Sequence, residues 1–112
     1  MLNFQNLDVY RCAVTLLGRA APLADRMPRG YASLGDQLRR AALSVPLNIA
    51  EGNGRLRGDA SHHYAIARGS ALECAAVLDA CEALGFVPDE ELTPLNELIE
   101  RVVSMLTKMA LK

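Results

Sequence analysis

Apolar side chains recur every three or four residues along most of this chain, which is the spacing of helices that bury one face. Proline and glycine residues interrupt the pattern and divide it into four segments. We expect helices over residues 6–25, 34–51, 60–84 and 89–109. Four helices of similar length with short connections predict an all-α protein, an antiparallel up-down four-helix bundle that takes in residues 1–112 as one domain.

The expected helix ends carry residue types that commonly start or stop helices. Ser33 is placed to cap the second helix, and Asp59 or Ser61 to cap the third. Residues 52–58 are rich in glycine and predict a flexible connection between these two helices. Gly85 is expected to end the third helix, because glycine tolerates the left-handed conformation that follows a last turn.

Each expected helix has an apolar stripe that should face the core. In the first helix, the residues at helical spacing are Leu7, Tyr10, Val14, Leu17 and Ala21. In the second, they are Leu34, Leu38, Ala41, Ala42, Val45 and Ile49. In the fourth, they are Leu92, Leu95, Leu98, Ile99, Val102, Leu106 and Met109.

The second helix carries a further apolar strip roughly opposite its core face, formed by Leu43, Leu47 and Ala50. A monomeric bundle needs no second strip of this kind. Scattered surface leucines are common in soluble proteins and are one interpretation. The other interpretation, which the adjacent positions of Leu43 and Leu47 favour, is an interface between subunits.

A polar stripe lies between the two apolar strips and consists of Gln37, Arg40, Ser44, Asn48 and Glu51. Polar groups flanked by apolar residues must find hydrogen-bond partners if they are covered. We therefore expect an at least partly buried polar network that fixes register and assembly, with a ligand-binding or active-site groove as the alternative.

Two single residues bear on this network. Pro46 stands in the middle of the second helix, so we expect a kink or break there, with Ser44 and Asn48 bonding the freed backbone groups. Glu73, in the third helix, falls on an apolar face beside Ile66 and needs a partner. Arg40 is the expected partner of Glu73.

Charge is unevenly distributed along the chain although its net value is only -1. Residues 1–68 carry nine arginines against five acidic residues, whereas residues 69–112 carry three basic residues against eight acidic ones. A solvated surface with internal ion pairs is one interpretation. The other is an arginine-bearing face for phosphate or an acidic partner, and its candidate residues are Arg39, Arg55, Arg57 and Arg68.

The composition gives no sign of a cofactor, a metal or a catalytic set. The three cysteines (Cys12, Cys74 and Cys81) form no C-x-x-C pair and predict reduced, buried thiols in a cytoplasmic protein. His62 and His63 are adjacent and are expected to be solvent-exposed or packed in a loop. With 51% apolar residues but no long apolar run, the chain predicts a globular core and no membrane span.

One segment of the sequence is specific enough to indicate a family. Gln37 and the run from Leu38 to Gly52 resemble the hallmark Q-L-R-R-A-A-x-S-I-P-x-N-I-A-E-G of the 23S rRNA-intervening-sequence proteins, also labelled S23 ribosomal proteins. The segment from Gly69 to Glu73 is similar to a later G-S-x-x-E element of that family, and Leu84-Gly85 to its helix-ending L-G.

The resemblance implies a bacterial four-helix protomer that assembles into a homopentameric, barrel-like ring, with no defined reaction. A related member, the accessory variability determinant of diversity-generating retroelements, binds a reverse transcriptase and nucleic acid through a basic surface. The present chain is instead mildly acidic.

Three functions therefore remain open. The first is a non-enzymatic homo-oligomeric adaptor whose arginines contact RNA, DNA or a nucleic-acid enzyme. The second is a scaffold that binds proteins alone. The third, an enzyme with a site at the polar stripe, has the least support, and no small-molecule substrate is expected.

Overall fold

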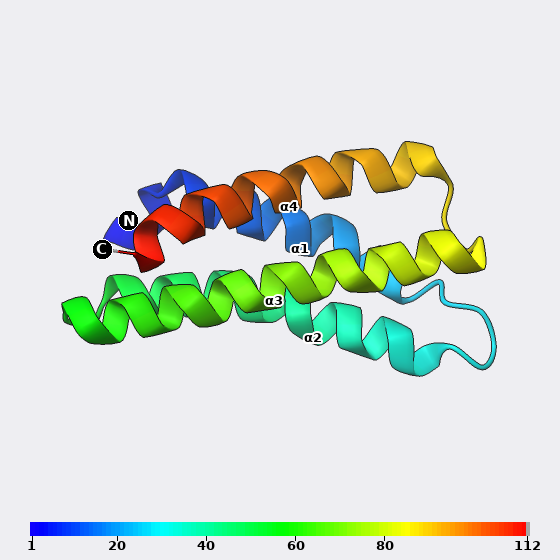
Figure 1. Cartoon of the computed structure of the whole chain (residues 1–112), viewed down its shortest axis with the longest axis horizontal. Coiled ribbons are helices and arrows are strands. Elements are labelled where there is room, and N and C mark those ends of the chain that lie inside the picture. The colour runs from blue at the N-terminus through cyan, green and yellow to red at the C-terminus, as the bar shows by residue number, and fades with distance from the viewer. Residues whose placement is uncertain (112) are drawn as a thin grey trace.

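The computed structural model describes residues 1–111, which contain a short 3-10 helix, η1 (Asn3–Asn6), four α-helices and no strand. The α-helices are α1 (Asp8–Ala24), α2 (Ala32–Asn53), α3 (Arg57–Leu84) and α4 (Asp89–Ala110). Successive helices run in opposite directions, and both chain ends lie at the end of the bundle where α2 turns into α3 (Figure 1). The prediction of an all-α four-helix bundle is confirmed.

The core is apolar and receives side chains from all four α-helices. The predicted stripes of α2 and α4 are confirmed, because nearly all of their members are buried and the remainder are half-buried. The most deeply buried large side chains are Leu16, Leu38, Val45, Ile49, Cys74, Leu78, Cys81, Val102 and Leu106. No helix among residues 1–111 is long and apolar enough to cross a membrane.

The predicted core stripe of α1 is wrong. Val14, one of its members, is 42% exposed, and the others are only half-buried. The side chains that α1 buries are instead Val9, Cys12, Ala13, Leu16, Ala20, Leu23 and Ala24. Several of these side chains are small, which allows the neighbouring helices to approach α1 closely.

Two helix starts differ from the prediction. Ser33 lies inside the first turn of α2 and does not cap it, because the helix begins two residues earlier than predicted, with Tyr31 at the N-cap. Leu56 is the N-cap of α3, which starts three residues before the predicted position and includes Gly58. Neither helix has a side-chain cap, but Asp59 places a carboxylate in the first turn of α3, where the helix dipole favours negative charge.

At the opposite end of the bundle, the two connections between helices pack against each other. Tyr31 and Phe86 meet edge to face with ring centroids 4.7 Å apart, which joins the α1–α2 and α3–α4 connections. Gly85 has a φ of 74° and ends α3 as predicted. Gly30 also has positive φ, 93°, and forms part of the turn after α1.

Pro46 does not break α2, so that part of the prediction is wrong. The helix continues without interruption from Ala32 to Asn53, and the proline ring is buried. The side-chain amide of Asn48 donates a hydrogen bond to the Ser44 carbonyl at 3.0 Å, so one carbonyl in this turn does gain a side-chain donor.

Candidate interaction surfaces

Four polar side chains form a hydrogen-bonded cluster between α2 and α3. The Asn48 amide donates to Ser44 Oγ at 3.0 Å, and the Ser70 hydroxyl donates to the same oxygen at 2.9 Å. His63 Nδ1 lies 3.0 Å from Asn48 Oδ1. The hydrogen bonds from His63 and Ser70 cross from α3 to α2 and so link the two helices. All four residues are half-buried, so the cluster lies at the base of the seam, the line along which α2 and α3 meet.

The hydrogen bonds fix the roles of the atoms in this cluster. Because the Asn48 amide nitrogen donates to Ser44, its Oδ1 must accept from His63, and Nδ1 therefore carries a proton. The expectation that His63 is solvent-exposed or loop-packed is thus wrong. His63 and Ser70 are seven residues apart in α3 and so share one helix face, and this spacing is a signal in the sequence that would have identified them.

The other predicted members of the buried network do not join it within one chain. Gln37, Arg40, Glu51 and Glu73 are all exposed, and no charged side chain among residues 1–111 is buried. Glu51 pairs with Arg55 one turn later instead, and this hydrogen bond lowers the pKa of the Glu51 carboxyl. The network is smaller than predicted because three of the five residues of the polar stripe on α2, Gln37, Arg40 and Glu51, face solvent.

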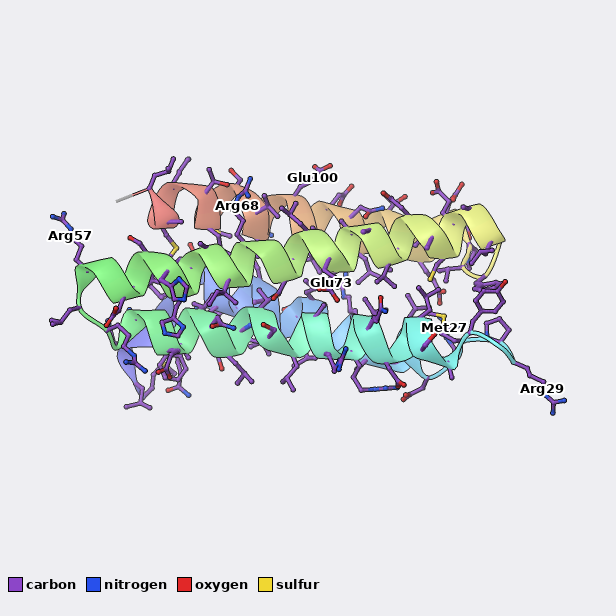
Figure 2. The ribbon with its side chains drawn as sticks, turned by 60° about the horizontal axis from the view of Figure 1, so that its bottom comes forward. Met27, Arg29, Arg57, Arg68, Glu73 and Glu100 are labelled. Carbon is purple, nitrogen blue, oxygen red and sulfur yellow. The ribbon has the colours of Figure 1, made fainter. Side chains whose placement is uncertain are left out.

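Arg40 and Glu73 form no ion pair within the described chain, which contradicts their predicted pairing. They nevertheless lie at the same level of the antiparallel α2–α3 pair. The Ser70 hydroxyl donates a hydrogen bond to Ser44, so these two residues are level with each other. Arg40 is one turn before Ser44 in α2, and Glu73 is one turn after Ser70 in α3, so Arg40 and Glu73 are level as well. Figure 2 shows Glu73 on the side of α3 that faces α2.

Large apolar side chains are exposed on α2 and on α3. Leu43 and Leu47 of α2 are 45% and 58% exposed, and Ile66 of α3 is 39% exposed. The register set by Asn48 and His63 places Leu47 and Ile66 at the same level. We call Arg40, Leu43, Leu47, Ile66 and Glu73 the α2–α3 outer face. Ala50, the third predicted interface residue, is half-buried.

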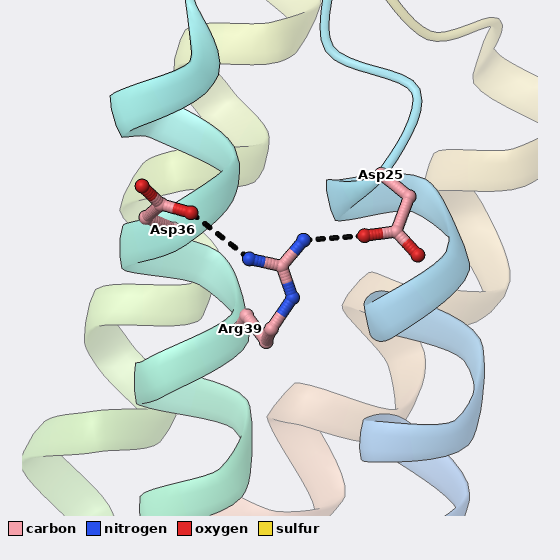
Figure 3. A network of polar contacts seen from close by, with 3 residues as sticks. All are labelled: Asp25, Asp36 and Arg39. Carbon is pink, nitrogen blue, oxygen red and sulfur yellow. Dashed lines mark hydrogen bonds and ion pairs between the residues drawn. The ribbon is translucent and has the colours of Figure 1, made fainter.

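The four candidate arginines do not form one surface. Arg39 pairs with both Asp25 and Asp36 and connects the end of α1 to α2 (Figure 3). Arg55 pairs with Glu51, as described above. Arg68 is half-buried, and its Nε donates to Thr107 Oγ1 of α4 at 2.8 Å.

Arg57 differs from the other three candidates. It is exposed, forms no ion pair among residues 1–111, and projects from the end of the bundle where α2 turns into α3 (Figure 2). The interpretation of the four candidate arginines as internal ion-pair partners therefore fits Arg39 and Arg55, and Arg57 is the one candidate that bonds to no side chain among residues 1–111. A further ion pair, Arg26 with Glu91 at 2.7 Å, joins the turn after α1 to α4 and was not predicted.

Residues 1–111 also contain a surface hollow at the polar stripe and three buried thiols. A hollow of about 380 Å³ lies over the start of the polar stripe and is lined by Ser33, Asp36, Gln37, Arg39 and Arg40. No group of three His, Cys, Asp or Glu residues in the described part of the chain is placed to hold a metal ion. All three cysteines are reduced and buried, and burial raises the pKa of the Cys74 thiol to about 12.

The fold defines a small four-helix-bundle protein with exposed apolar side chains on α2 and α3. The chain belongs to the 23S rRNA-intervening sequence protein family, whose sequence model matches residues 5–108. This match extends from η1 into the last turns of α4 and confirms the resemblance carried by the second helix. Among curated proteins, no sequence matches the chain significantly.

Proposed function

We propose that this protein is a non-enzymatic, cytoplasmic adaptor that acts as a homo-oligomer, a pentameric ring, with subunits that meet through the α2–α3 outer face. The observation that carries the proposal is the exposure of Leu43 and Leu47 on adjacent turns of α2, together with Ile66 of α3, which is level with Leu47. Large apolar side chains grouped on one face are typical of surfaces that another protein covers.

The energetics of covering this face are favourable. Complete burial of a leucine side chain stabilises by about 1.5–3 kcal/mol, and Leu43 and Leu47 each keep roughly half of their surface in water. The polar cluster at the base of the seam already has its hydrogen bonds within the chain. Covering the cluster therefore keeps these hydrogen bonds, which avoids much of the cost of burying polar groups.

Light scattering on the purified protein tests the assembly. We expect wild type to be an oligomer and Leu47→Glu to shift it to monomer, since a carboxylate at this position would have to be buried. Leu56→Glu is the matched control, because Leu56 is 85% exposed and lies in the α2–α3 turn outside the face. A monomeric wild type, or equal dissociation by both variants, would contradict the proposal.

The partner of the oligomer is best sought among proteins. The acidic excess of residues 69–112 suits a basic protein surface, and the four candidate arginines are scattered, with three of them bonded within the chain. A pull-down from nuclease-treated extract tests this choice. Retention of a basic protein after nuclease treatment supports a protein scaffold, and loss of all retained protein opposes it.

One observation favours nucleic acid as a second candidate. In a ring, the free Arg57 guanidinium would be repeated once per subunit at the same end of the assembly, and such repetition concentrates positive charge. We then expect retention of RNA that weakens as salt rises and is reduced in Arg55→Ala/Arg57→Ala. Arg29→Ala is the control, since Arg29 projects from the other end of the bundle (Figure 2). Absence of binding at low salt would rule this candidate out.

A further inference from the structure

We propose that Arg40 of one subunit forms an ion pair with Glu73 of a neighbouring copy when the α2–α3 outer face is covered. The inference rests on the proposed assembly and adds the contact that sets its specificity. It starts from two opposite charges that lie level across the α2–α3 seam, are both exposed, and are not paired with each other in one chain.

The surroundings of these two residues explain why they would pair across the interface. Arg40 lies one turn from Leu43 on α2, and Glu73 lies seven residues, two turns, from Ile66 on the same side of α3. A second copy that covers the leucines and the isoleucine also removes water from the guanidinium and the carboxylate. A charge that loses its water requires an opposite charge nearby.

The face also supplies both halves of the contact. Its α2 side offers Arg40 with Leu47, and its α3 side offers Glu73 with Ile66. When the α2 side of one copy meets the α3 side of the next, leucine packs against isoleucine and arginine meets glutamate. A contact between two α2 sides would instead bring two Arg40 guanidinium groups together, which is unfavourable. The charges therefore select one pairing of the apolar strips.

Charge reversal tests the pair directly. We expect Arg40→Glu alone and Glu73→Arg alone to weaken assembly by about tenfold or more, because each places like charges together. Mixing the two single variants should restore most of the lost assembly, since the carboxylate introduced on one copy would face the guanidinium introduced on the other at up to four of the five contacts of a pentameric ring. Light scattering measures each sample, and circular dichroism checks that the exposed substitutions leave the helices intact.

The double variant separates this proposal from pairing within one chain. Arg40→Glu/Glu73→Arg should assemble in either case, whereas rescue by mixing occurs only if the pair joins different copies. Assembly of the double variant without rescue by mixing would overturn the cross-subunit pair and leave the oligomer intact. Single variants that assemble like wild type would also overturn the cross-subunit pair and leave the oligomer intact. A monomeric wild type would overturn both this pair and the proposed assembly.

Discussion

Two glycines inside α2 mark positions where even one methyl group is too large. A Cβ atom at Gly35 would collide with the backbone carbonyl of Ala24, where the end of α1 crosses the start of α2. A Cβ at Gly52 would lie 2.8 Å from the Tyr64 ring of α3. These close approaches let α2 contact both α1 and α3. At Gly35 the neighbouring atom belongs to the backbone of Ala24, which cannot move aside as a flexible side chain can.

Gly35→Ala should therefore lower the free energy of unfolding by about 1–3 kcal/mol, the usual cost of overfilling a packed site. Gly18→Ala is the control, because Gly18 lies in α1 with open space around it. That change should raise stability by up to about 1 kcal/mol through helix propensity alone. Denaturant titration of both variants measures the difference, and equal effects would show that the contact with Ala24 is unimportant.

The buried thiols give a second prediction at the residue level. With the pKa of Cys74 raised to about 12 by burial, only about one thiol in ten thousand is ionised near pH 8. Since the thiolate is the reactive form, Cys74 should resist a disulfide reagent in the folded protein and react at once in denaturant. Cys12, at 8% exposure, should be the first of the three to react under native conditions. Rapid modification of Cys74 without unfolding would contradict this order.

Between elements, the contact of α2 with α3 combines apolar packing with the polar cluster. Asn48 is its central residue, since it bonds Ser44 on its own helix and His63 on the next. The cluster specifies the register, because a shift of either helix by one residue would separate these groups. Arg39 has a comparable role at the other end of α2, where it bridges Asp25 and Asp36.

Asn48→Ala should lower the free energy of unfolding by about 1–2 kcal/mol, since it removes bonds from partly buried groups. His63→Ala should cost less, because Asn48 keeps its bonds to Ser44. A double-mutant cycle on the two positions measures their coupling in urea titrations. Strictly additive effects would mean that the bond between Asn48 and His63 contributes nothing to stability.

The last turn of α2 should show a pH dependence of its own. Arg55 lowers the pKa of Glu51, so this pair stabilises the fold above the carboxyl pKa of the unfolded chain and is lost as the pH falls through the lowered value. Wild type should therefore melt above Glu51→Gln at neutral pH, and the difference should shrink as the pH falls below the usual glutamate pKa of about 4.3 and vanish below the lowered pKa of Glu51. A difference that persists in acid would show that another interaction of Glu51 is responsible.

For the whole molecule, the main consequence is that one chain leaves the α2–α3 outer face uncovered. If copies assemble through it, folding and association are linked, and the melting temperature must rise with protein concentration. We expect this rise for wild type and not for Leu47→Glu, as measured by thermal melts over a hundredfold concentration range. A wild-type melting temperature independent of concentration would contradict the linkage.

The sequence by itself determined the number and approximate bounds of the helices, because the 3.6-residue period and the proline and glycine breaks are local properties. It also identified the core stripes of α2 and α4 and the family, through the run that includes Ser44 and Asn48.

Only the tertiary structure decided which of two stripes α1 buries, since both have helical spacing and the choice depends on how neighbouring helices pack. It also showed that Asn48 bonds His63 and that Arg57 stays free while Arg39 is paired. Hydrogen bonds and ion pairs between helices depend on which residues end up level with one another, and helical periodicity within a single segment does not contain that information.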